Sequence, residues 1–137
     1  MKLTTTSLTI ELQPCRRVDD EDWVRVQVLV KANGFRGDFE AWLQLGDLER
    51  FALELGVMHE QVGRPATATL ASAEPDIHVK LTMQALGAIS GTYALESERP
   101  TGTPTLLSGA FELDQSYLPG IRQSVEALMA ELAATAR

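Results

Sequence analysis

The stretch Trp23-Val-Arg-Val-Gln-Val-Leu-Val-Lys-Ala-Asn-Gly-Phe-Arg-Gly-Asp-Phe-Glu-Ala-Trp-Leu-Gln44 decides the fold of this chain. Its first half alternates strictly, with a valine at every second position from Val24 to Val30, as in a strand with one buried face. Asn33-Gly34 follows, and this pair favours a type I′ turn because both central residues of that turn have positive φ. The stretch therefore predicts a β-hairpin.

A two-residue turn that pairs Ala32 with Phe35 sets the register of the whole hairpin. On one face every opposed pair is then apolar: Val28 with Phe39, Val26 with Ala41 and Val24 with Leu43. The other face pairs Trp23 with Gln44, Arg25 with Trp42 and Gln27 with Glu40. A slip of one residue would destroy both sets, so turn chemistry and burial pattern predict the same register.

Helical spacing replaces this alternation after the hairpin and again at the end of the sequence. Apolar residues recur at intervals of three and four from Leu48 to Met58, which predicts a helix from an N-cap at Asp47 to about Gln61. A second helix follows Asp114, with its apolar stripe at Leu118, Ile121, Val125, Leu128 and Leu132.

Short alternating segments fill the rest of the chain. They predict strands at 8–12, 66–70, 77–83, 88–97 and 105–113. The expected class is α+β, with a predominantly antiparallel sheet of six to seven strands in the order βββα-ββββα. Each strand offers one apolar face and each helix one stripe, so we expect both helices to pack on one face of that sheet. The other face would be polar and rich in threonine.

The chain has 137 residues, which fits a single domain over 1–137. Hydrophobic residues make up 45% and charged residues 23%, ordinary values for a globular protein. No apolar stretch approaches the roughly 18 to 20 residues of a membrane helix, and the N-terminus lacks the pattern of a secretory signal. We expect a cytoplasmic protein.

No motif predicts catalysis, a cofactor or a metal. Cys15 is the single cysteine, and neither His59 nor His78 has a second ligand at zinc spacing. Ser90 lies one position too late for the Gly-x-Ser-x-Gly turn of a hydrolase. The acidic run at 19–22 lacks the alternating ligands of a calcium loop, so a solvated turn is the simpler interpretation. We therefore expect a protein that is not an enzyme.

The net charge of −7 argues against nucleic acid as a partner, because such binding depends on Lys and Arg that neutralise phosphates. A basic protein would suit better. Trp42 beside Arg25 on a polar face is either an interface anchor or a ring covered by the N-terminal segment. The candidate partner-binding residues are Asp19, Asp20, Glu21, Asp22, Arg25, Glu40, Trp42, His78 and Lys80.

A set of landmarks resembles a known family. They are Trp23 before a valine-rich strand, Gly34-Phe-Arg-Gly37, Asp47-Leu-Glu-Arg-Phe51, Gly63, the segment Gly87 to Gly91, and the segment Phe111 to Leu118. Together, over about residues 20 to 132, they are similar to the WapI-type immunity proteins, small bacterial proteins that protect a cell from a cognate polymorphic toxin. The resemblance implies a cytoplasmic inhibitor that binds a toxin domain and performs no chemistry.

Two other functions remain open at this stage. One is a small-ligand-binding or enzymatic domain that uses the threonine-rich sheet face, with His78, Lys80, Glu40 and Gln44 as its polar groups. The other is an interaction module that forms a homodimer through its exposed face or a sheet edge.

Overall fold

The structure is a computed structural model that describes residues 1–17, 22–72, 76–97 and 102–134. These residues form two four-stranded antiparallel sheets, two α-helices and a short 3-10 helix. Sheet A has the order β1-β2-β3-β4, and sheet B the order β5-β6-β7-β8. The predicted α+β class with antiparallel strands is confirmed. The strand count and order differ in detail, because the observed order is ββββα-ββββα.

The bounds of the elements follow the prediction closely except at the N-terminus. Sheet A consists of β1 (Lys2–Thr4), β2 (Leu8–Arg17), β3 (Trp23–Ala32) and β4 (Phe35–Gln44). Sheet B consists of β5 (Ala66–Ala71), β6 (Ile77–Met83), β7 (Ala88–Glu96) and β8 (Leu106–Asp114). The helices are α1 (Leu45–Glu60), η1 (Gln115–Tyr117) and α2 (Leu118–Ala134).

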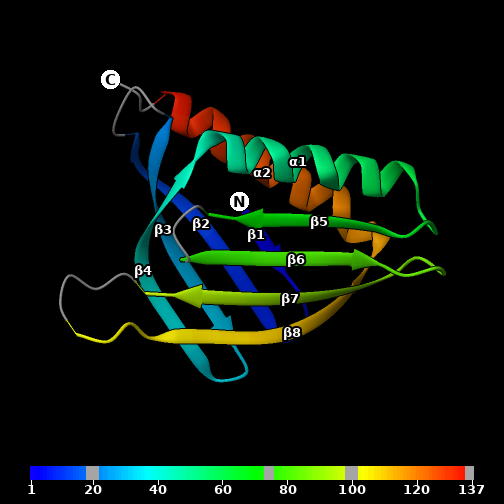
Figure 1. Cartoon of the computed structure of the whole chain (residues 1–137), viewed down its shortest axis with the longest axis horizontal. Coiled ribbons are helices and arrows are strands. Elements are labelled where there is room, and N and C mark those ends of the chain that lie inside the picture. Colours follow the sequence, from blue (N-terminus) through cyan, green and yellow to red (C-terminus); the bar gives the residue numbers. More distant parts are fainter. Residues whose placement is uncertain (18–21, 73–75, 98–101, 135–137) are drawn as a thin grey trace.

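The two sheets lie one behind the other with their strands crossing, and both helices run along one side of the pair (Figure 1). α1 packs against α2 and β5, and α2 also packs against β1 and β2. One hydrophobic core joins both sheets and both helices. The expectation that both helices cover one face of a single sheet was therefore wrong. The alternating pattern of a strand shows that one of its faces is buried, but it does not show which element covers that face. Here the covering element is largely the other sheet.

The β3–β4 hairpin confirms the predicted register at every pair from Trp23 with Gln44 to Ala32 with Phe35. Asn33 and Gly34 have φ values of 49° and 91°, so both occupy the left-handed region that a type I′ turn requires. Val24, Val26 and Val28 are fully buried.

Two local differences have clear physical causes. Asp47 is not the N-cap of α1 but its third residue, where its carboxylate accepts the backbone N–H of Gln44 at 2.9 Å. This is the return half of a capping box. In sheet A, β2 runs on past Leu12 through an irregularity between Pro14 and Arg16. Proline is tolerated there because β1 pairs only with residues 9–11.

The first and last elements of the domain are tied together. The backbone N–H of Lys2 in β1 donates to Oγ of Ser124 in α2 at 2.9 Å. The stripe of α2 is buried as predicted, including Leu128 and Leu132, and so are Phe51 and Leu55 of α1. α2 therefore covers the N-terminal part of sheet A.

Candidate functional site: the outer face of sheet A

The polar surface expected on one sheet is divided between two. Arg25, Glu40 and Trp42 lie on the outer face of sheet A, whereas His78 and Lys80 lie exposed on sheet B. The outer faces point away from the shared core, so they lie on different sides of the molecule. The ligand site imagined from His78, Lys80, Glu40 and Gln44 is therefore not assembled, because its residues belong to separate sheets.

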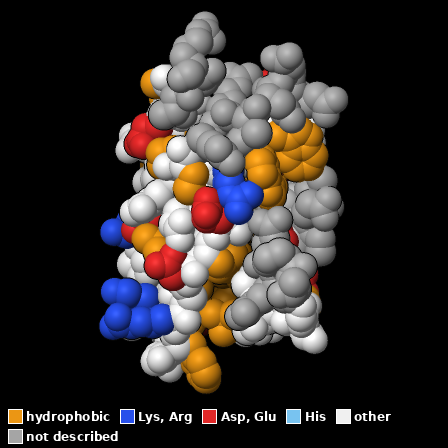
Figure 2. Space-filling model, turned by 90° about the vertical axis from the view of Figure 1, so that its left-hand side faces the viewer, with side chains coloured by type: hydrophobic (Ala, Val, Ile, Leu, Met, Phe, Trp, Pro, Cys, Tyr) orange, Lys and Arg blue, Asp and Glu red, His pale blue; other side chains and the backbone are white. Residues whose placement is uncertain are grey.

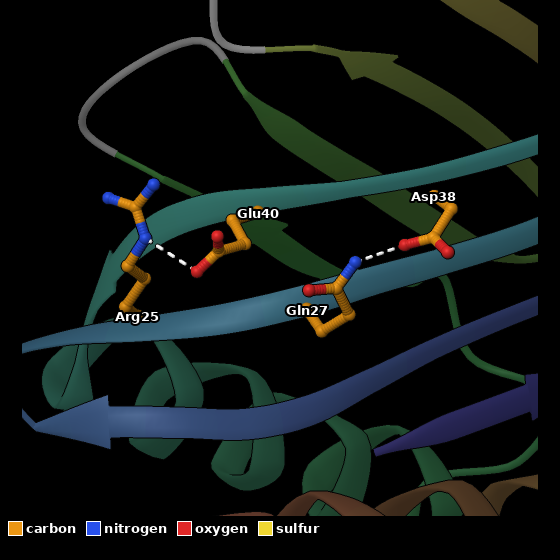
Figure 3. A network of polar contacts seen from close by, with 4 residues as sticks. All are labelled: Arg25, Gln27, Asp38 and Glu40. Atoms are coloured by element: carbon orange, nitrogen blue, oxygen red, sulfur yellow. Dashed lines mark hydrogen bonds and ion pairs between the residues drawn. The ribbon is translucent and has the colours of Figure 1, made fainter.

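Arg25 joins Trp42 and Glu40 on the outer face of sheet A. Its guanidinium carbon lies 4.9 Å from the centre of the Trp42 ring, which is the predicted cation–π contact. Its Nε donates to Oε1 of Glu40 at 2.8 Å (Figure 3). The side chain of Arg25 is only 23% exposed, against 45% for Glu40. Arg25 is thus held by two neighbours on the adjacent strand before any partner arrives.

A second polar contact repeats the same geometry one step along the hairpin. The side-chain amide of Gln27 donates to Oδ1 of Asp38 (Figure 3). In both contacts the acid lies diagonally across from its partner, since Arg25 is opposite Trp42 and Gln27 is opposite Glu40. Diagonal neighbours in an antiparallel pair are within reach of long side chains. The outer face therefore carries a ladder of side chains that are paired across the two strands.

The ladder ends at a shallow groove with a volume of about 530 Å³. The groove crosses all four strands of sheet A and is lined by Lys2, Thr4, Thr9, Glu11, Leu29, Val30, Lys31, Arg36, Gly37 and Asp38. Lys31 lies directly opposite Arg36, an arrangement of like charges that disfavours the strand pair. The diagonal neighbour of Arg25 is the acidic residue Glu40. The diagonal neighbour of Lys31 is Gly34, which has no carboxylate to offer. This end of the groove is locally basic in an acidic protein.

The described side chains in Figure 2 form no large patch of one charge. Basic and acidic side chains lie next to one another there, with hydrophobic side chains among them. Trp23 and Trp42 are both half-buried, as expected for rings that lie on a polar sheet face. Aromatic residues and Arg, which this face of sheet A carries, are among the residue types enriched at protein interfaces.

Of the predicted acidic run, Asp19, Asp20 and Glu21 lie outside the described residues. Asp22 is exposed and has a φ of 63°, and its carbonyl accepts the backbone N–H of Leu45 at 3.0 Å. This hydrogen bond fixes Asp22 at the junction of β4 and α1. The run therefore ends where β3 begins, at the edge of the outer face of sheet A.

Lys31, Arg36, Asp38 and the β1 residues of the groove were absent from the sequence-based candidates. The hairpin register already placed Lys31 opposite Arg36 and could have identified them. Lys2 and Thr4 had no such signal, because a three-residue strand shows no periodicity.

The described part of the chain offers little for other kinds of site. It contains no group of three or more His, Cys, Asp or Glu side chains that could hold a metal ion. Cys15 is exposed and forms no disulfide. No helix among the described residues is long and apolar enough to cross a membrane.

The fold and its outer face define the class of an α+β domain with two antiparallel sheets and a mixed polar and aromatic surface. The chain belongs to the immunity protein WapI-like family, whose model matches residues 3–133. No curated protein matches the chain. The family match confirms the resemblance seen in the sequence over about residues 20 to 132 and extends it at the N-terminus over β2 and most of β1.

Proposed function

We propose that this protein binds and neutralises a cognate toxin domain without performing chemistry, and that the outer face of sheet A is its binding surface. Membership of an immunity protein family supports the general role. The observation that supports this particular face is the contact of Arg25 with both Trp42 and Glu40. We also propose the cytoplasm as the place of action, as expected from the sequence.

An ordered side chain favours binding because less conformational entropy is lost when the partner arrives. Trp and Arg are also the residue types that most often dominate the free energy of protein association. On this face the Trp42 ring is half-buried and the guanidinium of Arg25 is already placed over it. The pair therefore suits the centre of an interface, with Gln27, Asp38 and Glu40 around it.

Two charged parts of the surface would contribute to recognition at different distances from the toxin. The net charge of −7 and the acidic run at 19–22 would attract a basic toxin over long range. At close range, Lys31 and Arg36 at the groove would suit carboxylates of the same partner.

The test is binding to the cognate toxin domain, with affinities measured by calorimetry and inhibition measured on the toxin's own activity. We expect Trp42→Ala to weaken binding by about 30-fold or more, the effect of losing a central anchor. Arg25→Ala should weaken it in the same direction. Inhibition should fall in proportion to affinity.

The matched controls lie on the outer face of sheet B, where His78→Ala and Lys80→Ala should leave affinity unchanged. The proposal fails if the sheet B variants weaken binding while Trp42→Ala and Arg25→Ala do not. Each variant should keep the wild-type circular dichroism spectrum and melting temperature within a few degrees, so that lost binding is not lost folding.

A further inference from the structure

The two sheets have four edges, and three of them are protected from pairing with another chain. β1 has only three residues, and its Lys2 N–H is bonded to Ser124 of α2. β5 lies against α1, where the N–H of Thr69 donates to Oε1 of Glu54 at 2.9 Å. β4 carries Arg36, Asp38 and Glu40, and charged side chains on an edge strand discourage edge-to-edge association.

β8 is the exception. Its first five residues, Leu106 to Ala110, carry no charge and no proline. The register with β7 continues without a bulge from Glu96 with Leu106 to Ala88 with Asp114. The side chain of Leu106 is 60% exposed. Glu112 and Asp114 lie in the second half of β8, so among the described residues it is the first half of this strand that lacks the charges, proline or covering helix seen at the other edges.

The hydrogen-bond alternation shows which residues of β8 face the open side. Ser97 N–H donates to the carbonyl of Thr105 at 2.9 Å, and the same register makes 105, 107 and 109 the residues bonded to β7. In an antiparallel pair the intervening residues direct their backbone groups away from that partner. Leu106, Ser108 and Ala110 thus present N–H and C=O groups to the open edge.

The order of side chains along this edge is self-complementary. Two large residues, Leu106 and Leu107, precede Ser108, and two small ones, Gly109 and Ala110, follow it. If a second β8 runs antiparallel about a twofold axis at Ser108, each large residue meets a small one. Leu106 lies opposite the second copy's Ala110 on one face, and Leu107 lies opposite its Gly109 on the other.

We propose that β8 pairs with β8 of a second copy of this chain, with Ser108 opposite Ser108, so that sheet B continues across a symmetric dimer. This pairing uses the outward backbone groups of Leu106, Ser108 and Ala110, which become narrow hydrogen-bonded pairs. It removes exposed apolar surface of Leu106 from water. A twofold axis requires such a self-complementary patch.

The pairing leaves the outer face of sheet A uncovered, because β8 belongs to the other sheet. The proposal therefore does not rest on the toxin-binding role. It also makes a prediction that is specific to this register: Ser108 lies opposite Ser108 of the second copy.

The test is sedimentation velocity of the whole chain from low micromolar to submillimolar concentration. We expect the mass to rise with concentration toward that of a dimer. Ser108→Lys should keep the chain monomeric, because two ammonium groups would meet at the axis. Thr67→Lys, on the protected β5, adds the same charge and should leave dimerisation unchanged. Circular dichroism establishes that each variant is folded.

A charge swap tests the register itself. Ser108→Glu alone should also be monomeric, whereas an equal mixture with Ser108→Lys should restore dimers containing one copy of each. A wild-type chain that stays monomeric throughout overturns the proposal. So does a dimer that Ser108→Lys leaves intact, or a mixture that stays monomeric. If Ser108→Lys weakens toxin capture while the wild type alone is monomeric, the edge serves the toxin instead and the proposal is wrong.

Discussion

The guanidinium carbon of Arg25 lies 4.9 Å from the centre of the Trp42 ring, directly across the β3–β4 pair. Nε of Arg25 also donates to Glu40 at 2.8 Å, so the guanidinium group contacts both Trp42 and Glu40. This contact should stabilise the hairpin as well as prepare a binding surface.

We expect Arg25→Lys and Trp42→Phe each to lower the free energy of unfolding, and their double-mutant cycle to show a coupling of about 0.5–1 kcal/mol. Lysine keeps the charge but loses the flat stacking surface of arginine. Urea denaturation of the two single variants and the double variant measures the coupling. Strictly additive effects would mean that the two side chains are neighbours without an energetic contact.

The helix stripes make a prediction about the core. Leu55 of α1 and Leu128 of α2 are 0% and 1% exposed, whereas Leu53 on the same helix as Leu55 is 65% exposed. We expect Leu55→Ala or Leu128→Ala to cost about 2–5 kcal/mol of unfolding free energy, since each leaves a cavity. Leu53→Ala should change it by less than about 0.5 kcal/mol. Equal effects at Leu53 and Leu55 would contradict the packing of α1.

The acidic run predicts a kinetic effect on toxin binding. Replacing Asp19, Asp20 and Glu21 with Asn, Asn and Gln removes charge from the run while keeping the size of each side chain. Association with a basic toxin should slow at low salt, and dissociation should change less, because steering acts before contact. Salt should reduce the difference, since the Debye length is about 8 Å at physiological ionic strength.

Surface capture of the toxin at two salt concentrations measures these rates. Replacing Glu49, Glu60 and Glu112, three exposed residues elsewhere in the chain, with Gln removes the same formal charge and serves as the control. An association rate that falls equally in both triple variants would assign the effect to net charge alone. An unchanged association rate in both triple variants would contradict long-range electrostatic attraction of the toxin.

Asp114 makes a prediction about pH. Hydrogen bonds from the Ser116 hydroxyl and from its backbone N–H, the latter at 2.8 Å, hold the pKa of Asp114 below its ordinary value of 3.8. A carboxyl whose folded pKa is depressed stabilises the fold above its ordinary pKa, and this contribution is lost as pH falls through the folded value.

Asp114→Ala should therefore be less stable than wild type at neutral pH, and the difference should shrink as the pH falls below 3.8. Urea denaturation across that range measures it. Glu112→Ala, which removes an exposed carboxylate two residues earlier, is the control for the loss of one negative charge from this part of the chain. A gap for Asp114→Ala that persists in strong acid would mean that the alanine acts through the backbone of η1 instead.

The hairpin shows what sequence reasoning can achieve when two independent signals coincide. Asn33-Gly34 determined the turn and the valines determined the buried face, so every pair from Trp23 with Gln44 onward was predicted correctly. The arrangement of the sheets lacked such a signal. The alternation in Ile77 to Met83 shows that one face is buried, but a helix and a second sheet bury it equally well.

The candidate site was predicted only in the part that depends on the hairpin register. Arg25, Glu40 and Trp42 came together because one register governs all three. His78 and Lys80 were placed with them only through the assumption of a single sheet. The groove depends on β1, whose three residues are too few for any periodic pattern, so Lys2 could not be assigned to it.

The hydrogen bond between Lys2 and Ser124 also bears on the order in which the domain forms during synthesis. β1 and β2 emerge from the ribosome before α2, which covers them. The apolar side of β1 and β2 must therefore stay partly uncovered in the nascent chain until α2 has been synthesised. We infer that a chain stalled before α2 presents this surface to chaperones and proteases.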